Sequence, residues 1–527
     1  MKTARPAASR EIDVDGPELA VDLQRPDRCP PPRPSSVTLE TTHLSWVFLT
    51  DTEAWKVKRP VDYVFANYST LERRRHFCEE EVRLNRRLAP DVYLDVWPVR
   101  RDPTGFTMTG GGRIVDYAVR MRRLPRDRSA ESLLEQGRLT PDLLDLLART
   151  LGDFYERAGI LRHFGGVDAL QRVLQENVEQ VEPYVGDLIG IDEWRGLRDW
   201  QEAFLKKNRD RFESRVEEGR IREGHGDLRL EHVYFADDRV RVIDCIDFNE
   251  RFRYLDAASD AAFLAMELEH RRRPDLAGWF LGRFAAATHD FDFFPLLDFY
   301  LCTKAWIRAK VACFVSEDPT TPASKRERKR QEARSLFTLA TAFTRPPVRS
   351  PRLVAFGGAV ASGKSTLAEG LSRALGFPVI SSDPVRKHLA GLGTLDRGGP
   401  DLYSPDMTER VYDEILRRAS LVLESGRSAI LDATFGRRRH RDDLRLAAKR
   451  AGVPLLFVET RCDVDTARTR LRKRAQEPSV SDAREDLLDR SLRDFEPARE
   501  LPPAESMIVD TSAAPARILP SILDRIL

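Results

Sequence analysis

The sequence predicts two folded units of different class: an α+β unit, followed by an α/β unit with three layers and a parallel sheet. Short apolar runs alternate with helical patterns in the second half, whereas hairpin patterns precede long helical patterns in the first half. A stretch with three prolines, residues 344–351, separates the halves because proline removes a donor and ends helices. The length of 527 residues is sufficient for two large domains.

The composition excludes several classes of protein. Lys and Arg total 86 and Asp and Glu total 84, so a net charge of +2 creates no global field for nucleic acid or membranes. The six cysteines are scattered without a CxxC pair, as expected for thiols in a reducing compartment. No apolar run approaches the roughly 20 residues that span a bilayer, and the first residues lack the apolar centre of a signal peptide. We expect a cytoplasmic protein without membrane partners.

Composition also predicts the domain boundaries. Residues 1–35 alternate charge, alanine and proline and cannot bury enough apolar surface to offset chain entropy, so we expect a disordered tail. Residues 36–345 and residues 346–527 are expected to form the two folded domains. The basic run Ser324–Ser335 is expected to be a solvated helix face or an exposed loop rather than a nucleic-acid site.

The first domain is expected to begin with strands and to end with helices. Its expected elements are a hairpin over residues 43–50 and 53–61, a helix from about 71 to 88, strands near 93–99 and 113–121, helices within 141–220, a hairpin that turns at 237–238, and helices within 255–343. A small sheet followed by a large helical part is an α+β arrangement, with a ligand expected between the two.

The second domain alternates strands with helices. Its expected strands are RLVAFGG, PVISSD, SAILDATF, PLLFVET and SMIVDTS, and its clearest helices follow Lys364, Pro405 and His440. Glycines 376, 426 and 452 stand where these three helices should end. Such alternation requires right-handed crossovers and a parallel sheet covered on both faces.

A phosphate-binding loop follows the first strand of this domain. Residues Gly358–Ser365 match G-x-x-x-x-G-K-[ST] without a mismatch. Glycines allow backbone N–H groups to turn toward phosphate oxygens, Lys364 can reach the β- and γ-phosphates of ATP, and the Ser365 hydroxyl can bind Mg²⁺. The expected nucleotide-binding residues are Gly358, Ala361, Ser362, Gly363, Lys364, Ser365 and Thr366.

Two aspartates at strand ends are expected to complete this site. Asp383 closes PVISSD and Asp432 lies in SAILDATF, and both strands should end at the same sheet edge as the phosphate loop. One carboxylate can take a proton from an attacking hydroxyl and the other can hold Mg²⁺, although a single aspartate could equally be a helix N-cap. Arg386, one helical turn after Asp383, can hold an anionic substrate group.

Arginines beyond the fourth strand are candidates for a lid. Arg470 and Arg474 lie four residues apart on one face of an expected helix, just before a polar loop. Arginines on a closing lid can neutralise charge on the transferred phosphoryl group. Arg468 and Arg472 are expected to be solvated.

A second candidate phosphate site lies in the first domain. His225-Gly226-Asp227 precedes the second hairpin and Asp244 follows it, so the hairpin brings two carboxylates together. One can accept a hydroxyl proton while the other holds Mg²⁺ against ATP phosphates. Lys56 lies on a strand and can pair with phosphates if a helix carboxylate holds it. Glu81 lies on an apolar helix face, and two alternatives remain open: a buried partner for a strand lysine, or a surface ion pair with nearby arginines.

The second domain resembles the small P-loop kinases, which include polynucleotide 5′-kinases, gluconate-type kinases, and zeta-toxin-like and chloramphenicol-type phosphotransferases. The resemblance spans about Arg352–Leu527 and rests on GGAVASGKST, SSDPVRKHL and LDATF. In the polynucleotide kinase branch, an Asp with an Arg three residues on serves as base and substrate clamp. The resemblance implies these roles for Asp383 and Arg386.

The first domain resembles the aminoglycoside phosphotransferase family, a branch of the protein-kinase-like fold. The resemblance covers about Val37–Phe343 and rests on HGDLRLEHVYF and VIDCIDFNERFRYLDAASDAAFLAMELE. STLERRRHFCEEEVRLNRRLAPDVYL and DYAVRMRRLP are similar to the bacterial subgroup in which that domain is fused to a P-loop kinase. The implied roles are base for Asp227, Mg²⁺ ligand for Asp244, phosphate-pairing lysine for Lys56 and adenine-binding hinge for Met121–Arg123.

The first domain departs from this family at a metal position. The family has Asn five residues after the base, whereas His232 stands there in this sequence. Imidazole is a poor ligand for a hard, oxygen-seeking ion, so the domain is either an active kinase with altered metal binding or a domain that binds without transferring.

The sequence therefore predicts an ATP- and Mg²⁺-dependent phosphotransferase, expected to be bifunctional, that acts on a hydroxyl of a small molecule. Two rivals stay open. One is a nucleic-acid 5′-hydroxyl kinase, and the other is a toxin-like or signalling ATP-binding protein whose first domain only senses a ligand.

Overall fold

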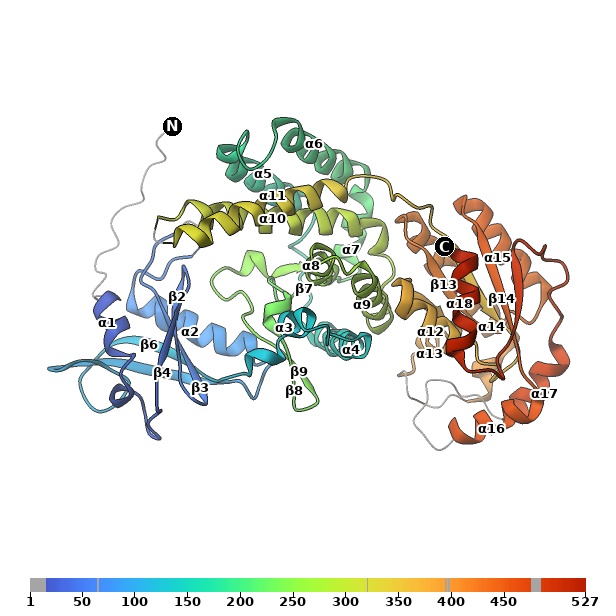
Figure 1. Cartoon of the computed structure of the whole chain (residues 1–527), viewed down its shortest axis with the longest axis horizontal. Coiled ribbons are helices and arrows are strands. Elements are labelled where there is room, and N and C mark those ends of the chain that lie inside the picture. The colour runs from blue at the N-terminus through green and yellow to red at the C-terminus, as the bar shows by residue number, and fades with distance from the viewer. Residues whose placement is uncertain (1–15, 64–65, 320, 394–395, 397–398, 475–484) are drawn as a thin grey trace. The chain divides into compact units, whose positions relative to one another are not determined.

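The computed structural model describes all residues except 1–15, 64–65, 320, 394–395, 397–398 and 475–484 (Figure 1). By its internal contacts the chain divides into two compact units. The first unit consists of Met1–Leu139, Arg157–Gly165 and Arg215–Asp260, and the second of Thr140–Glu156, Gly166–Ser214 and Ala261–Leu527. Most helices of the predicted first domain therefore belong to the same unit as the α/β part, and the boundary at residue 345 stays a prediction.

The first unit is built on a six-stranded antiparallel sheet with the order β1-β2-β3-β6-β4-β5. Its strands are β1 (Thr38–Thr41), β2 (Ser45–Leu49), β3 (Glu53–Lys58), β4 (Tyr93–Asp102), β5 (Gly105–Thr107) and β6 (Arg113–Arg122). The predicted first hairpin is present as β2 and β3. In β3, Lys56 lies opposite Val47 and Val119, while Lys58 lies opposite Ser45.

Helix α2 (Leu71–Asn85) packs on this sheet, where Cys78 and Val82 join an apolar cluster with Val119 and Met121. The hydroxyl of Thr70 caps the helix by accepting from the Arg73 amide. The helix ends three residues before the predicted Leu88. Its apolar face carries Glu81 into the interior.

Short elements close the first unit. The second predicted hairpin is present as β8 (Val233–Ala236) and β9 (Arg239–Val242), and Asp237 and Asp238 at its turn have φ of +52° and +55°. Two successive positive φ values give the turn the twist that antiparallel strands require. The remaining elements are α3 (Ala130–Glu135), β7 (Ile221–Glu223) and β10 (Tyr254–Asp256), and β7 pairs with β10.

The N-terminal segment differs from the predicted disordered tail. Residues 1–15 lie outside the described residues, but α1 (Gly16–Asp22) is folded onto the first unit. Leu19 and Leu23 are fully buried in the cluster that contains Phe106, and the Asp22 carboxylate accepts from the Phe106 amide at 2.8 Å. Four-residue spacing places both leucines on one face, so this segment buries apolar surface despite its charges.

The second unit begins with helices that come from the predicted first domain. The helices before residue 343 are α4 (Pro141–Arg157), α5 (Val167–Val181), α6 (Ile191–Lys207), α7 (Arg209–Glu217), α8 (Ala257–His270), α9 (Pro274–Ala287), α10 (Leu297–Glu317) and α11 (Ala323–Ala342). The basic run lies on α11, where Arg330 pairs with Asp187 at 2.5 Å and Lys329 with Glu332 at 2.5 Å.

A five-stranded parallel sheet with the order β12-β13-β11-β14-β15 forms the rest of the second unit. The strands are β11 (Leu353–Gly357), β12 (Val379–Ser381), β13 (Ala429–Asp432), β14 (Leu455–Arg461) and β15 (Ser506–Asp510). The predicted alternation of strands and helices is confirmed. Phe356 and Ser381 are both in register with Asp432, so three neighbouring strands end at one edge.

Helices cover this sheet (Figure 1). They are α12 (Lys364–Leu375), α13 (Ser382–Leu389), α14 (Pro405–Glu424), α15 (Arg438–Ala451), α16 (Val464–Arg474), α17 (Glu485–Asp494) and α18 (Pro515–Ile526). One cluster joins the inward faces of α12 and α18, including Leu367 and Ile522, to Val354 and Val458 of the sheet. Within the described parts of the chain, no helix is long and apolar enough to cross a membrane.

The packing of α1 gives a stability prediction. Replacing fully buried Leu19 by alanine (Leu19→Ala) should lower the free energy of unfolding by about 2–5 kcal/mol, because it removes apolar contacts and leaves a cavity. Val21, on the same helix and 65% exposed, provides the matched control Val21→Ala, which should change stability by less than about 0.5 kcal/mol. Urea unfolding of the two variants measures the difference, and equal midpoints would contradict the packing described.

Candidate functional site

The phosphate loop connects β11 to α12 through backbone conformations that favour glycine. Gly358 has φ of +140°, and a Cβ atom there would lie 2.4 Å from the Thr460 carbonyl oxygen. Gly363, with φ of +91°, stands directly before α12 and begins the helix without a side-chain cap. The loop therefore leads the chain sharply into a helix N-terminus, where backbone N–H groups are unpaired and attract anions.

Two threonines from neighbouring strands brace the loop. The Ser362 hydroxyl bonds to the Thr460 hydroxyl at 2.6 Å, and Thr460 donates in turn to the Gly357 carbonyl at 3.0 Å. Thr511 donates to the Ser362 carbonyl at 2.7 Å. Neither threonine was a predicted site residue, although both lie at the ends of segments that were expected to be strands, PLLFVET and SMIVDTS.

Lys364 folds back across the loop. Its Nζ atom donates to the carbonyl oxygens of Gly358 at 3.1 Å and Ala359 at 2.8 Å. Thr366 lies in the first turn of α12, and Ala361, inside the loop, has φ of +61°. The predicted nucleotide-binding residues therefore form one continuous loop whose lysine lies where a phosphate group would be held.

Acidic and hydroxyl groups gather beside the loop at the sheet edge. Asp432 ends β13, is 6% exposed, and accepts from the Ser381 hydroxyl at 3.2 Å. Burial raises the pKa of Asp432 above its ordinary value and nearby Asp383 raises it further, whereas Lys364 and a hydrogen bond with Ser365 lower it. The oxygen atoms of Ser365 and Asp432 are ligands that suit Mg²⁺.

Arg386 lies on α13, one turn after Asp383. Its guanidinium donates to the Leu402 carbonyl at 2.9 Å and stands over the Tyr403 ring at 4.8 Å. Its Nε atom is buried and has no hydrogen-bond partner within the described part of the chain. A buried donor without a partner is costly, so this arginine has a contact available for a ligand.

The candidate lid arginines lie on α16. Arg470 donates to the Ala361 carbonyl at 3.3 Å and to the Thr511 carbonyl at 2.5 Å, so it contacts the phosphate loop. The side chain of Arg474 lies outside the described residues. Arg468 is exposed and pairs with Asp489 at 3.5 Å.

A cavity of about 730 Å³ runs beside the phosphate loop. It is lined by residues of the loop and of the elements that follow β12 and β13, among them Lys364, Ser365, Asp383, Arg386, Tyr412, Asp432 and His440. The ring of His440 stacks on Tyr412 with centroids 3.7 Å apart, and burial lowers the pKa of His440 to about 4. This imidazole is therefore neutral near pH 7.

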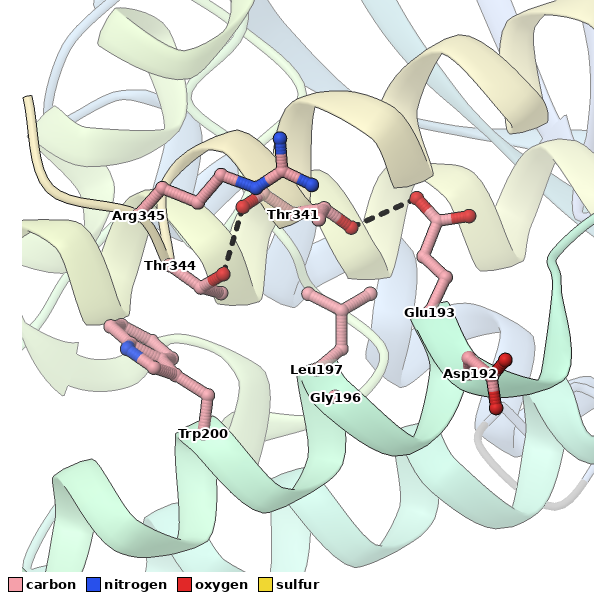
Figure 2. Close-up of a pocket in the computed structure, with 8 residues that line it drawn as sticks. All are labelled: Asp192, Glu193, Gly196, Leu197, Trp200, Thr341, Thr344 and Arg345. Atoms are coloured by element: carbon pink, nitrogen blue, oxygen red, sulfur yellow. Dashed lines mark hydrogen bonds between the residues drawn. The ribbon is translucent and has the colours of Figure 1, made fainter. Parts of the chain in front are cut away.

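A second cavity of about 470 Å³ lies between α6 and the end of α11 (Figure 2). There the Thr341 hydroxyl donates to Glu193 at 2.9 Å, and Thr344 donates to the Thr341 carbonyl at 2.8 Å (Figure 2). These polar groups already pair with one another, so the cavity beside the phosphate loop is the stronger candidate for chemistry.

The first unit contains a buried network of lysines and carboxylates. Lys56 lies 2.8 Å from one oxygen of Glu81 and 2.6 Å from Asp244, whereas Lys58 lies 2.8 Å from the other Glu81 oxygen and also pairs with Asp247. Glu81 is 1% exposed. Burial alone would raise the pKa of Glu81, but the two lysines hold it below its ordinary value. Of the two alternatives for Glu81, the buried partner is the one observed.

His232 lies between the two aspartates of the first unit. Its Nδ1 atom is 2.9 Å from the Asp227 carbonyl oxygen, and its Nε2 atom is 3.6 Å from Asp244. The other Asp244 oxygen binds Lys56. An imidazole beside a carboxylate that is already paired does not fit an oxygen-rich Mg²⁺ site. Asp260 accepts from the amides of His225 and Gly226 at 2.7 Å and 3.0 Å and so orients the loop that carries Asp227.

Backbone amides of the predicted hinge, Met121–Arg123, are already hydrogen-bonded within the first unit. Met121 is buried in β6 beside Ala54 and Tyr93. The Arg122 amide donates to the Val92 carbonyl and the Arg123 amide donates to the Thr52 carbonyl, each at 2.8 Å. These two amides are therefore not available to adenine.

The chain is similar in sequence to a family model and to proteins of two mycobacteria. A family model described as an AAA domain matches residues 353–498. The uncharacterized protein Rv2004c of Mycobacterium tuberculosis is 34% identical over 453 residues, which cover 83% of this chain and 86% of the relative. The uncharacterized protein Mb2027c of Mycobacterium bovis matches to the same extent.

Two solved structures are also similar. A gluconokinase from Sinorhizobium meliloti is 23% identical with a TM-score of 0.27 and covers 34% of this chain and 93% of its own. A putative aminoglycoside phosphotransferase from Ralstonia eutropha is 13% identical with a TM-score of 0.38 and covers 62% of this chain and 97% of its own.

The folds and the two sites define the class of protein. The loop with Lys364, at the edge of a parallel sheet and within the AAA domain match, makes the second domain a P-loop nucleotide-binding domain. Lys56 on β3 and Glu81 on α2 form the ion pair of a protein-kinase-like fold. The chain therefore combines a part that has a protein-kinase-like ion pair with a P-loop nucleotide-binding domain. It belongs to the family of the mycobacterial proteins Rv2004c and Mb2027c.

The strained turn of the phosphate loop gives a second prediction. Gly358→Ala should lower the affinity for ATP about tenfold or more, because the new Cβ atom would meet the Thr460 carbonyl in a conformation that costs about 1–3 kcal/mol. The control is Gly196→Ala, since a Cβ atom on Gly196 would meet nothing within 4 Å. Calorimetric titration with a non-hydrolysable ATP analogue measures both, and unchanged affinity in Gly358→Ala would contradict the role assigned to the turn.

Proposed function

We propose that the P-loop centre transfers the γ-phosphoryl group of ATP, with Mg²⁺, to a hydroxyl group of a small molecule. The observation that carries the proposal is the cluster at one sheet edge, where Lys364, Ser365, Asp383 and Asp432 line one cavity. The proposal is supported by the shared edge of three parallel strands, because ligands of open α/β sheets bind at that edge.

Each residue has a role in this mechanism. The loop amides and Lys364 hold the β- and γ-phosphates, and Arg386 orients the acceptor. Ser365 and Asp432 would hold Mg²⁺, which supplies positive charge to the phosphate oxygens. Asp383 accepts the proton of the acceptor's hydroxyl group, and the oxygen of that hydroxyl bonds to the γ-phosphorus. The bond between the γ-phosphorus and the β–γ bridging oxygen breaks at the same time, and ADP leaves. Arg470, already at the loop, can neutralise charge on the transferred group.

Two variants test this centre. Lys364→Ala should lower phosphoryl transfer at least about a hundredfold and weaken ATP binding, whereas Asp383→Asn should lower transfer similarly and leave ATP binding intact. Transfer from labelled ATP is measured over a panel of sugars, aminoglycosides, nucleosides and oligonucleotides, with the exposed control Glu156→Gln. Products that are unchanged in Lys364→Ala would exclude the P-loop centre.

We further propose that the first unit is a second centre, which makes the protein bifunctional. The supporting observation is that Lys56, held by buried Glu81, lies against Asp244 beside His232 and Asp227. A lysine fixed in this way can pair with phosphates, and Asp227 can accept a hydroxyl proton. No step is assigned to a metal at this centre, because its donors do not fit Mg²⁺.

The variant Asp227→Asn tests whether the protein has two catalytic centres or only the P-loop centre. If Asp227 is a base, this variant should abolish one product of the acceptor panel and leave the product of the P-loop centre unchanged. Asp238→Asn, at the exposed hairpin turn, is the matched control. Normal formation of every product in Asp227→Asn would instead favour a first unit that only senses a ligand.

A further inference from the structure

One side of the cavity beside the phosphate loop comes from helices that precede the P-loop domain by more than 50 residues. Asp145, Arg149 and Asp153 of α4 line it, together with Arg283 and Ala287 of α9. Positions 145, 149 and 153 recur every four residues and therefore share one face of α4. We call this set of residues the helical wall.

Close packing within the second unit holds the helical wall in place. A Cβ atom on Gly278 of α9 would lie 2.2 Å from the Gly376 carbonyl at the end of α12, so only glycine permits this approach. A Cβ atom on Gly282, one turn later, would lie 2.9 Å from Pro378. Asp142 of α4 pairs with Arg373 of α12 at 2.5 Å. The helices and the α/β part therefore enclose the cavity as one packed body.

The helical wall carries two carboxylates and two arginines, and Glu369 of α12 adds a third carboxylate beside it. Asp145 is paired with Arg149 at 3.0 Å and with Arg283 at 2.5 Å, so two arginines share one aspartate. Arg283 also lies 3.6 Å from Glu369 of α12, another residue of the cavity lining. Asp153 adds an exposed carboxylate. Carboxylates accept hydrogen bonds from hydroxyl and amino groups, whereas they repel phosphodiesters.

We propose that the helical wall recognises the acceptor of the P-loop centre, and that this acceptor is a small molecule with several hydroxyl or amino groups rather than a nucleic acid. The proposal rests on the proposed function of that centre. Proteins that bind single strands use an open, positively charged groove with aromatic rings for base stacking. Here α4 and α9 build one side of the cavity, where the two arginines are already paired with Asp145 and the carboxylate of Asp153 is exposed. Asp153 is the specificity-determining residue of this wall.

Acceptor kinetics in the full-length protein test the role of Asp153. Asp153→Asn should raise the acceptor KM about tenfold, because one charge-assisted hydrogen bond is weakened, while kcat and ATP affinity change less than about twofold. Glu156→Gln changes an exposed carboxylate of the same helix that does not line the cavity, and it should leave all three quantities unchanged. Equal KM values in Asp153→Asn and wild type, or oligonucleotides as the preferred acceptors, would overturn the proposal.

Thiol modification tests the wall without any acceptor. In Asp153→Cys, a saturating non-hydrolysable ATP analogue with Mg²⁺ should slow the reaction with a neutral methanethiosulfonate reagent severalfold. In Glu156→Cys the nucleotide should have no effect. Five native cysteines are buried and Cys462 is half-buried, so the wild type provides the baseline.

The kinetic and thiol-modification tests distinguish failure of the proposed function from failure of the helical wall. Failure of the wild type to bind the nucleotide by calorimetry, or to phosphorylate any acceptor, would remove the proposed function. Nucleotide binding without protection of the thiol in Asp153→Cys would remove the helical wall and leave the P-loop centre intact.

Discussion

The phosphate loop depends on hydrogen bonds between its backbone and two threonines of neighbouring strands. Thr460 and Thr511 hold Gly357 and Ser362 at distances of 2.7–3.0 Å, and this bracing keeps the loop in conformations that ordinary side chains avoid. Lys364 then has carbonyl partners inside the loop, and Asp432 lies beside it at the sheet edge. Binding of a triphosphate therefore needs little rearrangement of the backbone, because the strained turn is already formed.

The buried carboxylates of the two candidate centres have different partners. At the P-loop centre, burial raises the pKa of Asp432 and nearby Asp383 raises it further, so a bound cation would stabilise its charged form. In the first unit, Glu81 is satisfied by two lysines and Asp244 by one of them. Carboxylates and lysines therefore form an ion-pair network in the first unit, whereas Asp432 beside the phosphate loop bonds to hydroxyl groups and lies near Lys364.

Glycine has a structural role at the junction of α9 with α12 as well as in the phosphate loop. Gly278 and Gly282 are four residues apart on one face of α9 and allow its backbone to approach residues 376–378. This contact explains why helices assigned to the first half by sequence share a compact unit with the α/β part. A boundary drawn from proline content cannot detect it, since packing between distant segments leaves no local signal.

The sequence by itself determined the local chemistry. A complete G-x-x-x-x-G-K-S match predicted a strand, a loop and a helix, because each of its residue types is needed by that conformation, and alternating apolar runs predicted the parallel sheet. It also predicted that Asp383 and Asp432 would meet at one edge. The partner of each charged group depends instead on tertiary packing. Glu81 could have paired with surface arginines, Arg470 could have faced solvent, and Leu19 could have belonged to a tail. Their partners are distant in sequence, and burial by those distant elements, rather than local propensity, sets the energy of each contact.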